Sequence, residues 1–151
     1  MDQFMKQAIQ LALDNVEKGG QPFGAVLVRG NEVIAEGVNE LHLHYDISGH
    51  AELLAIRRAQ ADLKTLDLSD CTIYASGEPC AMCLTAMYFA GIQDVYYAAS
   101  VDDAEQAGLG KSKMIYRELA KARSEREINI IQMQIDQSLA DPMKQWKDKQ
   151  K

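Results

Sequence analysis

The segment CTIYASGEPCAMCLTAMYFA, residues 71–90, decides the fold. Its beginning, residues 71–75, is a short run with β-branched and aromatic side chains, which predicts a strand. Residues 80–90 are mostly good helix formers, and Pro79 stands at or near the first turn, where a missing N–H is harmless. A strand that passes within a few residues into a helix is the building unit of α/β domains. We therefore expect a layered α/β protein.

The sequence on both sides of this segment continues the alternation. Residues 2–18 place apolar side chains near helical spacing, and residues 24–28 and 33–36 predict two strands joined by a hairpin turn at residues 29–32. The other expected elements are a helix at 50–61, a strand at 95–99, a helix at 113–120, a strand at 128–135 and a closing helix at 141–147. Trp146 in the closing helix is expected to pack against other residues. We expect one domain over residues 1–151, with helices covering a central sheet.

Two cysteines of the central segment are candidate metal ligands. Cys80 and Cys83 lie three residues apart on the expected helix, so their side chains point the same way. His50 opens the other expected helix. One imidazole and two thiolates supply three ligands for a tetrahedral Zn²⁺, and the fourth position stays open for water, as in catalytic zinc sites. The sequence therefore predicts a catalytic zinc centre at His50, Cys80 and Cys83.

Glu52 follows the histidine by two residues and is the candidate catalytic residue. A carboxylate near the metal but not bound to it can take a proton from the water and deliver it to the substrate. Such general acid–base catalysis typically contributes ~10²–10⁴ in rate. A purely structural zinc does not need this carboxylate. Glu52 therefore favours an enzyme over a non-catalytic, zinc-stabilised interaction module.

Composition excludes several classes of protein. The chain has 151 residues, 47% of them hydrophobic, which fits a folded domain with a sizeable core. The formal net charge of −6 disfavours a broad nucleic-acid surface, because phosphate binding needs clustered Lys and Arg. The odd number of cysteines, three, argues against a disulfide scaffold and for a reducing, cytoplasmic environment. No signal peptide and no membrane span is expected.

The joint pattern of His50-Ala51-Glu52 and Pro79-Cys80-Ala81-Met82-Cys83 is the known signature of zinc deaminases. On these residues the chain resembles the cytidine/deoxycytidylate deaminase superfamily, and within it the bacterial guanine deaminases and the related tRNA adenosine deaminases. The resemblance starts near Gln21 and extends to the C-terminus. It includes residues 21–26, 36–39, 55–57, 70–74 and 97–99, and the later segments 104–108 and 115–116 resemble guanine deaminases in particular.

The resemblance implies a fold, a site and an assembly. The fold is a three-layer α/β/α domain with a mixed five-stranded sheet. The substrate contacts fall on Asn39, which would bond the edge of the base, on the backbone of Ala51, and on Phe23, which would pack against the ring. A homodimer is also implied, in which C-terminal segments can be exchanged between subunits.

The activity that the resemblance implies is zinc-dependent hydrolytic deamination of a nucleobase, with guanine or a related aminopurine first and ammonia as the product. The same chemistry would serve cytosine or another aminopyrimidine. Deamination of tRNA adenosine would require a basic groove for the anticodon loop. The net negative charge of the chain counts against such a groove.

Three departures from guanine deaminases bear on this choice. Gly77 stands where they typically carry Cys. Lys111 lies in a loop that is acidic in them and supplies a carboxylate to the base, for which Asp102 and Asp103 are candidate substitutes. The chain also ends soon after Trp146.

Overall fold

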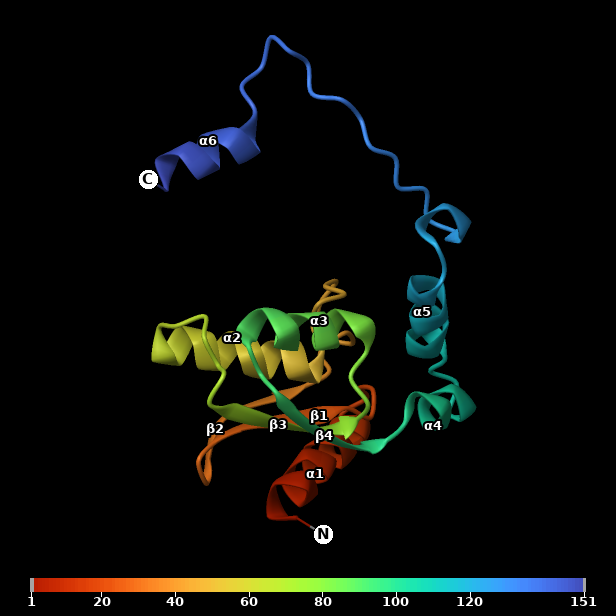
Figure 1. The fold of residues 1–151 in the computed structure, drawn as a ribbon. Helices are drawn as coiled ribbons and strands as arrows, with labels where there is room; N and C mark the ends of the chain where they lie inside the picture. The colour runs from red at the N-terminus through yellow and green to blue at the C-terminus, as the bar shows by residue number, and fades with distance from the viewer. Residues whose placement is uncertain (1, 151) are drawn as a thin grey trace. The chain divides into compact units, whose positions relative to one another are not determined.

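The computed structural model describes residues 2–150, which form one compact unit ending at Arg117 and a second beginning at Glu118. The first unit has three layers (Figure 1). Helix α1 (Gln3–Glu17) covers one face of the sheet, and helices α2 (Ala51–Leu63) and α3 (Ala81–Ala90) cover the other. The three-layer α/β/α architecture expected from the sequence is confirmed.

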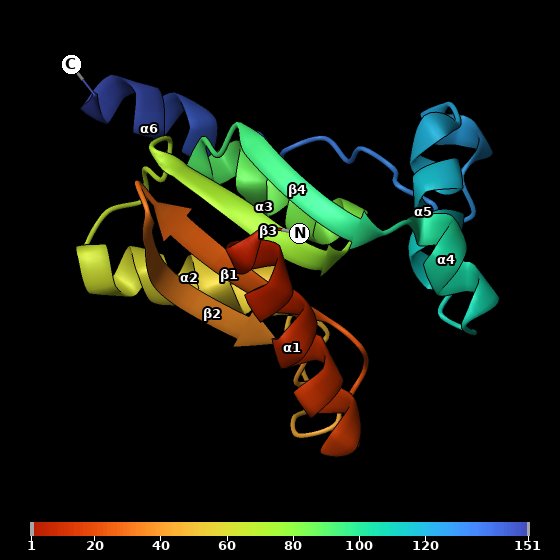
Figure 2. The same cartoon turned by 90° about the horizontal axis from the view of Figure 1, so that it is seen from below.

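The sheet is mixed, as expected. Its order is β2-β1-β3-β4, made of β1 (Gly24–Arg29), β2 (Glu32–Val38), β3 (Cys71–Gly77) and β4 (Asp94–Ala99). β1 pairs antiparallel with both β2 and β3, whereas β3 and β4 run parallel. The parallel pair is joined by α3, which crosses the face of the sheet opposite α1 (Figure 2). The predicted hairpin between the first two strands is present.

The central strand β1 is buried on both of its faces, which explains its continuous apolar sequence. Side chains alternate along a strand. Ala25 and Leu27 therefore join the core cluster beneath α2 and α3, while Val26 and Val28 pack with residues of α1. Two hydrophobic layers thus hold the helices against the two faces of one sheet.

The start of α2 lies directly on the neighbouring strand β2. A Cβ atom at Gly37 would collide with the backbone carbonyl oxygen of Ala51. Glycine at this position therefore permits a close helix–strand approach. This approach fixes the place of His50, the residue immediately before α2.

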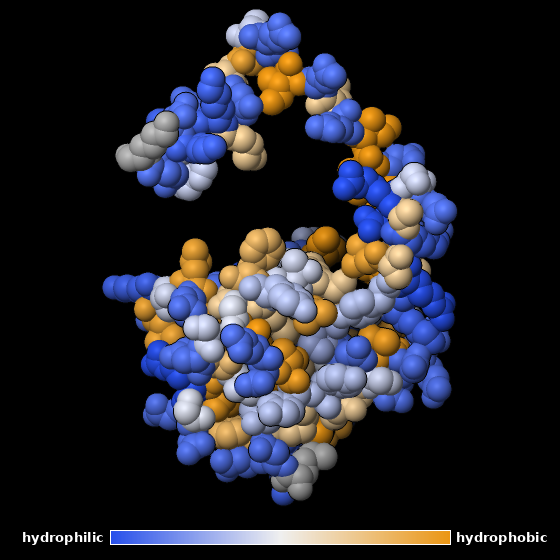
Figure 3. Space-filling model, viewed as in Figure 1, coloured by the Kyte–Doolittle hydropathy of each residue, from blue (hydrophilic) through white to orange (hydrophobic). Residues whose placement is uncertain are grey.

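The expected fifth strand was wrong, since the sheet within residues 2–150 has four strands. Residues 128–135 have no regular secondary structure, and their apolar side chains lie on the surface (Figure 3); among them Ile131 is 81% exposed. An extended segment becomes a strand only when its backbone groups pair with another strand. The described residues of the second unit contain no strand with which this segment pairs.

The remaining elements are short helices. α4 (Val101–Gln106) was not predicted, while α5 (Lys111–Ala120) and α6 (Pro142–Lys149) match the two expected C-terminal helices, and a 3-10 turn covers Arg123–Glu125. Trp146, expected to pack, is 67% exposed. No helix within residues 2–150 is long and apolar enough to cross a membrane.

Candidate active site

The three predicted metal ligands lie together at the N-terminal ends of two helices. His50 is the N-cap residue of α2, Cys80 is the N-cap residue of α3, and Cys83 lies in the first turn of α3. Their donor atoms lie within 4.8 Å of one another. The Nδ1 atom of His50 is 3.4 Å from the Cys80 sulfur and 3.6 Å from the Cys83 sulfur. One nitrogen and two sulfurs in this arrangement fit zinc.

The electrostatics of this group favour an anionic thiolate. The pKa of Cys80 is lowered to about 4, chiefly by a hydrogen bond from the Cys83 thiol and also by the hydrogen bond with His50. Cys83 shares that hydrogen bond with Cys80 and is buried, and both effects raise its pKa. The pKa of His50 is raised by its hydrogen bond with Cys80. Zinc binding displaces such protons, because thiolate and neutral imidazole are the ligating forms.

Glu52 lies in the first turn of α2 and is 6% exposed. Burial raises the pKa of its carboxyl group to about 7, because removal from water disfavours the charged form. A carboxyl group that titrates near neutral pH can accept a proton in one step and donate it in the next. The structure therefore places beside the ligand group a residue with the properties of a general acid–base catalyst.

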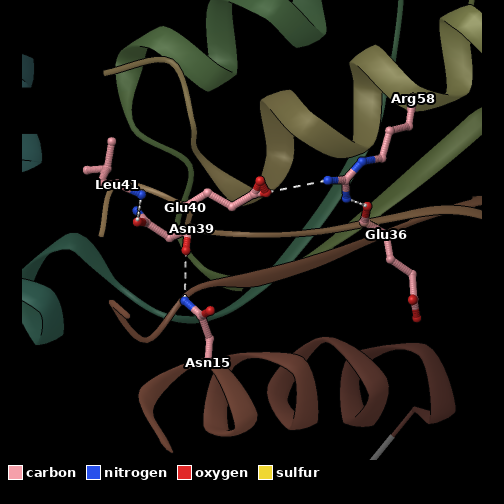
Figure 4. Close-up of polar contacts among 6 residues, drawn as sticks. All are labelled: Asn15, Glu36, Asn39, Glu40, Leu41 and Arg58. Carbon is pink, nitrogen blue, oxygen red and sulfur yellow. Dashed lines mark hydrogen bonds and ion pairs between the residues drawn. The ribbon is translucent and has the colours of Figure 1, made fainter. Parts of the chain in front are cut away.

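Asn39 follows β2 and is 2% exposed. Its Oδ1 atom accepts a hydrogen bond from the Leu41 N–H at 3.0 Å (Figure 4), and its Nδ2 atom donates to the Gln21 side-chain oxygen at 3.3 Å. The bond from Leu41 fixes which way the amide group faces, because a backbone N–H can only donate. One N–H and one lone pair of the Asn39 amide remain for another partner.

Asn15 of α1 holds two loops of the site together, and the sequence analysis did not single it out. Its Nδ2 atom donates to the backbone carbonyl oxygens of Gln21 at 2.8 Å and Asn39 at 2.9 Å. Figure 4 shows the second of these bonds. Asn15 is 4% exposed. The sequence did contain a signal that could have identified Asn15: it is a polar residue on the otherwise apolar face of an amphipathic helix.

Arg58 of α2 is a second connection that was not predicted. Its guanidinium group donates to the backbone carbonyl oxygen of Glu36 at 2.7 Å and lies 3.5 Å from the Glu40 carboxylate (Figure 4). These contacts join α2 to the end of β2 and to the residues that follow it. The segment that carries Asn39 is thus tied to the helix that carries Glu52.

Ala51 directly follows His50, and Phe23 packs against the same hydrophobic core cluster as Cys80. Ala51 is fully buried and belongs to the same core cluster as Cys83, and Phe23 packs against this cluster. The Phe23 N–H donates to the Gln21 carbonyl oxygen at 2.8 Å, and its own carbonyl oxygen accepts from the Asn39 N–H at 3.1 Å. The three residues expected to contact substrate therefore come from segments that are bonded to one another or packed together.

Two residues beyond the predicted set hold the loop in front of Cys80. The Tyr116 hydroxyl of α5 donates to the Pro79 carbonyl oxygen at 2.5 Å, and burial raises the pKa of Tyr116 to about 12. The Glu78 carboxylate accepts from the Val101 N–H, the first residue of α4, at 3.1 Å. Helices α4 and α5 are thereby connected to a ligand loop.

The other candidates of the sequence analysis are not part of the ligand group. Lys111 is the first residue of α5. Asp102 lies 2.5 Å from the Lys113 ammonium group, and Asp103 accepts from the Ser100 N–H in the capping box of α4. Both carboxylates, considered as substitutes for a base-binding acid, are thus engaged by neighbouring residues. The two remaining histidines of the chain, His42 and His44, are exposed residues of the loop before His50.

Comparison with known proteins identifies the class. Residues 1–99 match the model of the cytidine and deoxycytidylate deaminase zinc-binding region. The chain belongs to this family, and it is a zinc-dependent aminohydrolase with a His/Cys/Cys ligand group.

Individual relatives add detail. The chain is 42% identical over 146 residues to the guanine deaminase of Bacillus subtilis strain 168, which covers 96% of this chain and 92% of the relative. The crystal structure of guanine deaminase from Bacillus subtilis superposes with a TM-score of 0.89 and 41% identity, covering 98% of this chain and 95% of the other. The structure of guanine deaminase from Nitrosomonas europaea superposes with a TM-score of 0.66 and 34% identity, covering 70% of this chain and 62% of the other. The tRNA-specific adenosine deaminase of Aquifex aeolicus is 38% identical over 96 residues, 64% of each chain.

Proposed function

We propose that this protein deaminates a free nucleobase by hydrolysis, with guanine or a close aminopurine as substrate and ammonia as product. The observation that carries the proposal is the placement of buried Glu52 beside the His50, Cys80 and Cys83 donor group. Similarity along nearly the whole chain to the guanine deaminase of Bacillus subtilis supports guanine as the base.

In the proposed mechanism His50, Cys80 and Cys83 would hold a zinc ion, and its Lewis acidity would let a water molecule lose a proton near neutral pH. Glu52 would accept a proton from that water, while the oxygen of the water bonds to the ring carbon that carries the amine. Glu52 would give this proton to the ring nitrogen beside that carbon, and would then take the second proton from the newly attached hydroxyl and pass it to the leaving amine. The carbon–nitrogen bond breaks, ammonia leaves, and a carbonyl group remains on the ring.

The other site residues would bind and orient the base. The free N–H and lone pair of the Asn39 amide match the donor and acceptor pattern of a base edge. The backbone of Ala51 supplies further polar contact, and Phe23 packs against the ring. Asn15 contributes by holding the segments of Asn39 and Phe23 at fixed positions.

Ammonia release from a panel of amines tests the proposal. Zinc-loaded protein is incubated with guanine, adenine, cytosine, guanosine and tRNA, and the Glu52→Gln variant serves as the inactive control. Turnover of guanine in preference to the other compounds is expected. Efficient turnover of cytosine with guanine left intact, or of tRNA alone, would contradict the proposed substrate while leaving the family assignment unchanged.

We also propose that residues 1–151 act as a single deaminase domain within a cytoplasmic homodimer, in which C-terminal segments are exchanged. Two features support this assembly. β4 is an edge strand of the sheet, with Tyr96 and Tyr97 about half exposed. The segment 128–135 is rich in isoleucine, which is common in strands, but carries its apolar side chains on the surface. An unpaired edge and an unpaired strand-like segment are complementary between two copies.

Light scattering after size exclusion tests the dimer. A mass of twice that of one chain is expected. Ile131→Lys, which places a charge among the exposed apolar side chains, should shift the equilibrium toward the monomer. Lys18→Glu, at an exposed position after α1, is a charge-changing control outside the C-terminal segment. A monomer at micromolar concentration for the unmodified protein would contradict the assembly.

A further inference from the structure

We infer that Gly77 sets the position of the Phe23 ring in the substrate site by leaving room for it, an inference that rests on the proposed role of Phe23 at the base. Gly77 is the last residue of β3. A Cβ atom placed on it would lie 2.7 Å from Cε1 and 2.9 Å from Cδ1 of Phe23. Non-bonded carbon atoms prefer a separation of about 3.5–4.0 Å. The Phe23 ring thus occupies the space that any side chain at position 77 would need.

The backbone of Gly77 does not itself require glycine. The glycines with a positive φ angle are Gly19, Gly30, Gly91 and Gly108, and Gly77 is not among them. Apart from the Phe23 ring, the nearest atom to a Cβ at position 77 is the Ala99 carbonyl oxygen, at an ordinary 4.0 Å. The aromatic ring alone therefore accounts for the glycine.

The ring, and not the backbone, has to yield to a larger residue at position 77. Hydrogen bonds hold the backbone of Phe23 on both sides, to Gln21 and to Asn39. The next residue, Gly24, donates its N–H to the Ser76 hydroxyl at 2.9 Å. β1 and β3 are also paired immediately beyond this point. A side chain at position 77 would consequently rotate the ring about its own torsions.

Rotation of this ring changes the substrate pocket. Phe23 is half-buried, with one edge against Gly77 and part of the side chain packed on the cluster that contains Ala51 and Cys83. Displacement from β3 changes the surface of the ring against which the proposed function packs the base. Gly77 is accordingly a positioning residue that acts on base binding through the place it leaves for the Phe23 ring.

A double-mutant cycle tests this coupling, with the unmodified protein, Gly77→Ala, Phe23→Leu and the double variant. Gly77→Ala should keep its zinc and its kcat within about two-fold, and raise KM for the preferred purine about ten-fold, the scale of one methyl group in a tight pocket. In the Phe23→Leu background the same substitution should change KM by less than about two-fold, because the clashing ring is gone. Thr72→Ala, also on β3, is the control that should change none of these quantities.

Two outcomes would overturn the inference: an unchanged KM in Gly77→Ala, or an equal rise in KM with and without the Phe23 ring. If Gly77→Ala fails to hold zinc or to fold, the midpoint of thermal unfolding provides the readout. Recovery in the double variant supports the coupling, and no recovery overturns it. Failure of this inference can be told apart from failure of the proposed function. The substrate panel tests guanine, and absence of guanine turnover would contradict the proposed substrate. The double-mutant cycle is measured with whichever base is turned over, and also by thermal unfolding.

Discussion

Replacing Asn15 with Ala should destabilise the protein and weaken substrate binding without removing zinc. Asn15 donates to the carbonyl oxygens of Gln21 and Asn39, and the second of these bonds is buried. A buried polar group left without a partner costs about 1–3 kcal/mol, and a partly solvated one costs less. The two lost bonds together predict a fall in the free energy of unfolding of about 2–4 kcal/mol. At roughly 2–4 °C per kcal/mol for a chain of this size, the melting temperature should fall by roughly 5–15 °C.

The effect on function follows from what Asn15 holds. Loss of its bonds loosens the loops that carry Phe23 and Asn39 but leaves the N-terminal ends of α2 and α3, where the metal ligands lie, unchanged. KM for the preferred base should therefore rise, while the zinc content stays at one ion per chain. Calorimetry, metal analysis and steady-state kinetics measure the three quantities on one preparation.

Two further variants make the reasoning refutable. Gln10→Ala on the same helix removes an exposed side-chain bond to Asp14 and should change stability by at most about 0.5 kcal/mol. Asn15→Asp has nearly the same shape but no N–H donor, so it should be at least as damaging as Asn15→Ala. If Asn15→Ala and Gln10→Ala had equal melting temperatures and equal KM values, Asn15 would not hold these loops.

Four other changes have definite expected outcomes. Glu52→Gln should retain zinc and fold but lose ~10²-fold or more in kcat, because an amide cannot carry the proton; retained activity would remove Glu52 from the mechanism. Cys80→Ala should lose zinc and lower the melting temperature, since the metal joins two helices, and metal analysis would show otherwise if another donor sufficed. Asn39→Ala should raise KM with an unchanged zinc content, by an amount matching about 1–3 kcal/mol, and an unchanged kcat/KM would exclude it from the site. Tyr116→Phe removes the bond to the Pro79 carbonyl and should weaken zinc affinity up to about 10-fold in competition with a chelator, whereas the exposed Tyr88→Phe should not.

The zinc ligand group was predictable because its chemistry is local. Cys80 and Cys83 lie on one turn of one helix, so their spacing alone predicts that both thiols reach the same point. His50 and Glu52 lie on the first turn of another helix in the same way. The residue types and their short spacings therefore predicted a catalytic metal centre before the two helices were known to meet.

Whether residues 128–135 form a strand could not be predicted from the local sequence in this way. Its isoleucine-rich composition favours a strand, but a strand also needs a partner for its backbone groups, and local composition does not specify that partner. Residues 24–28 show the opposite case, because their partners on both sides are present in the chain and the predicted strand formed.

The sequence by itself determined the α/β class, the hairpin and the donor set of the metal centre, since each depends on residues that are close along the chain. Only the tertiary structure decided that Asn15 of the first helix bonds the loops of Gln21 and Asn39, and that the Phe23 ring lies where a side chain at Gly77 would lie. These contacts join residues far apart in the sequence, where no periodicity or short motif links them. Their existence depends on how closely the layers pack, which is a property of the folded chain as a whole.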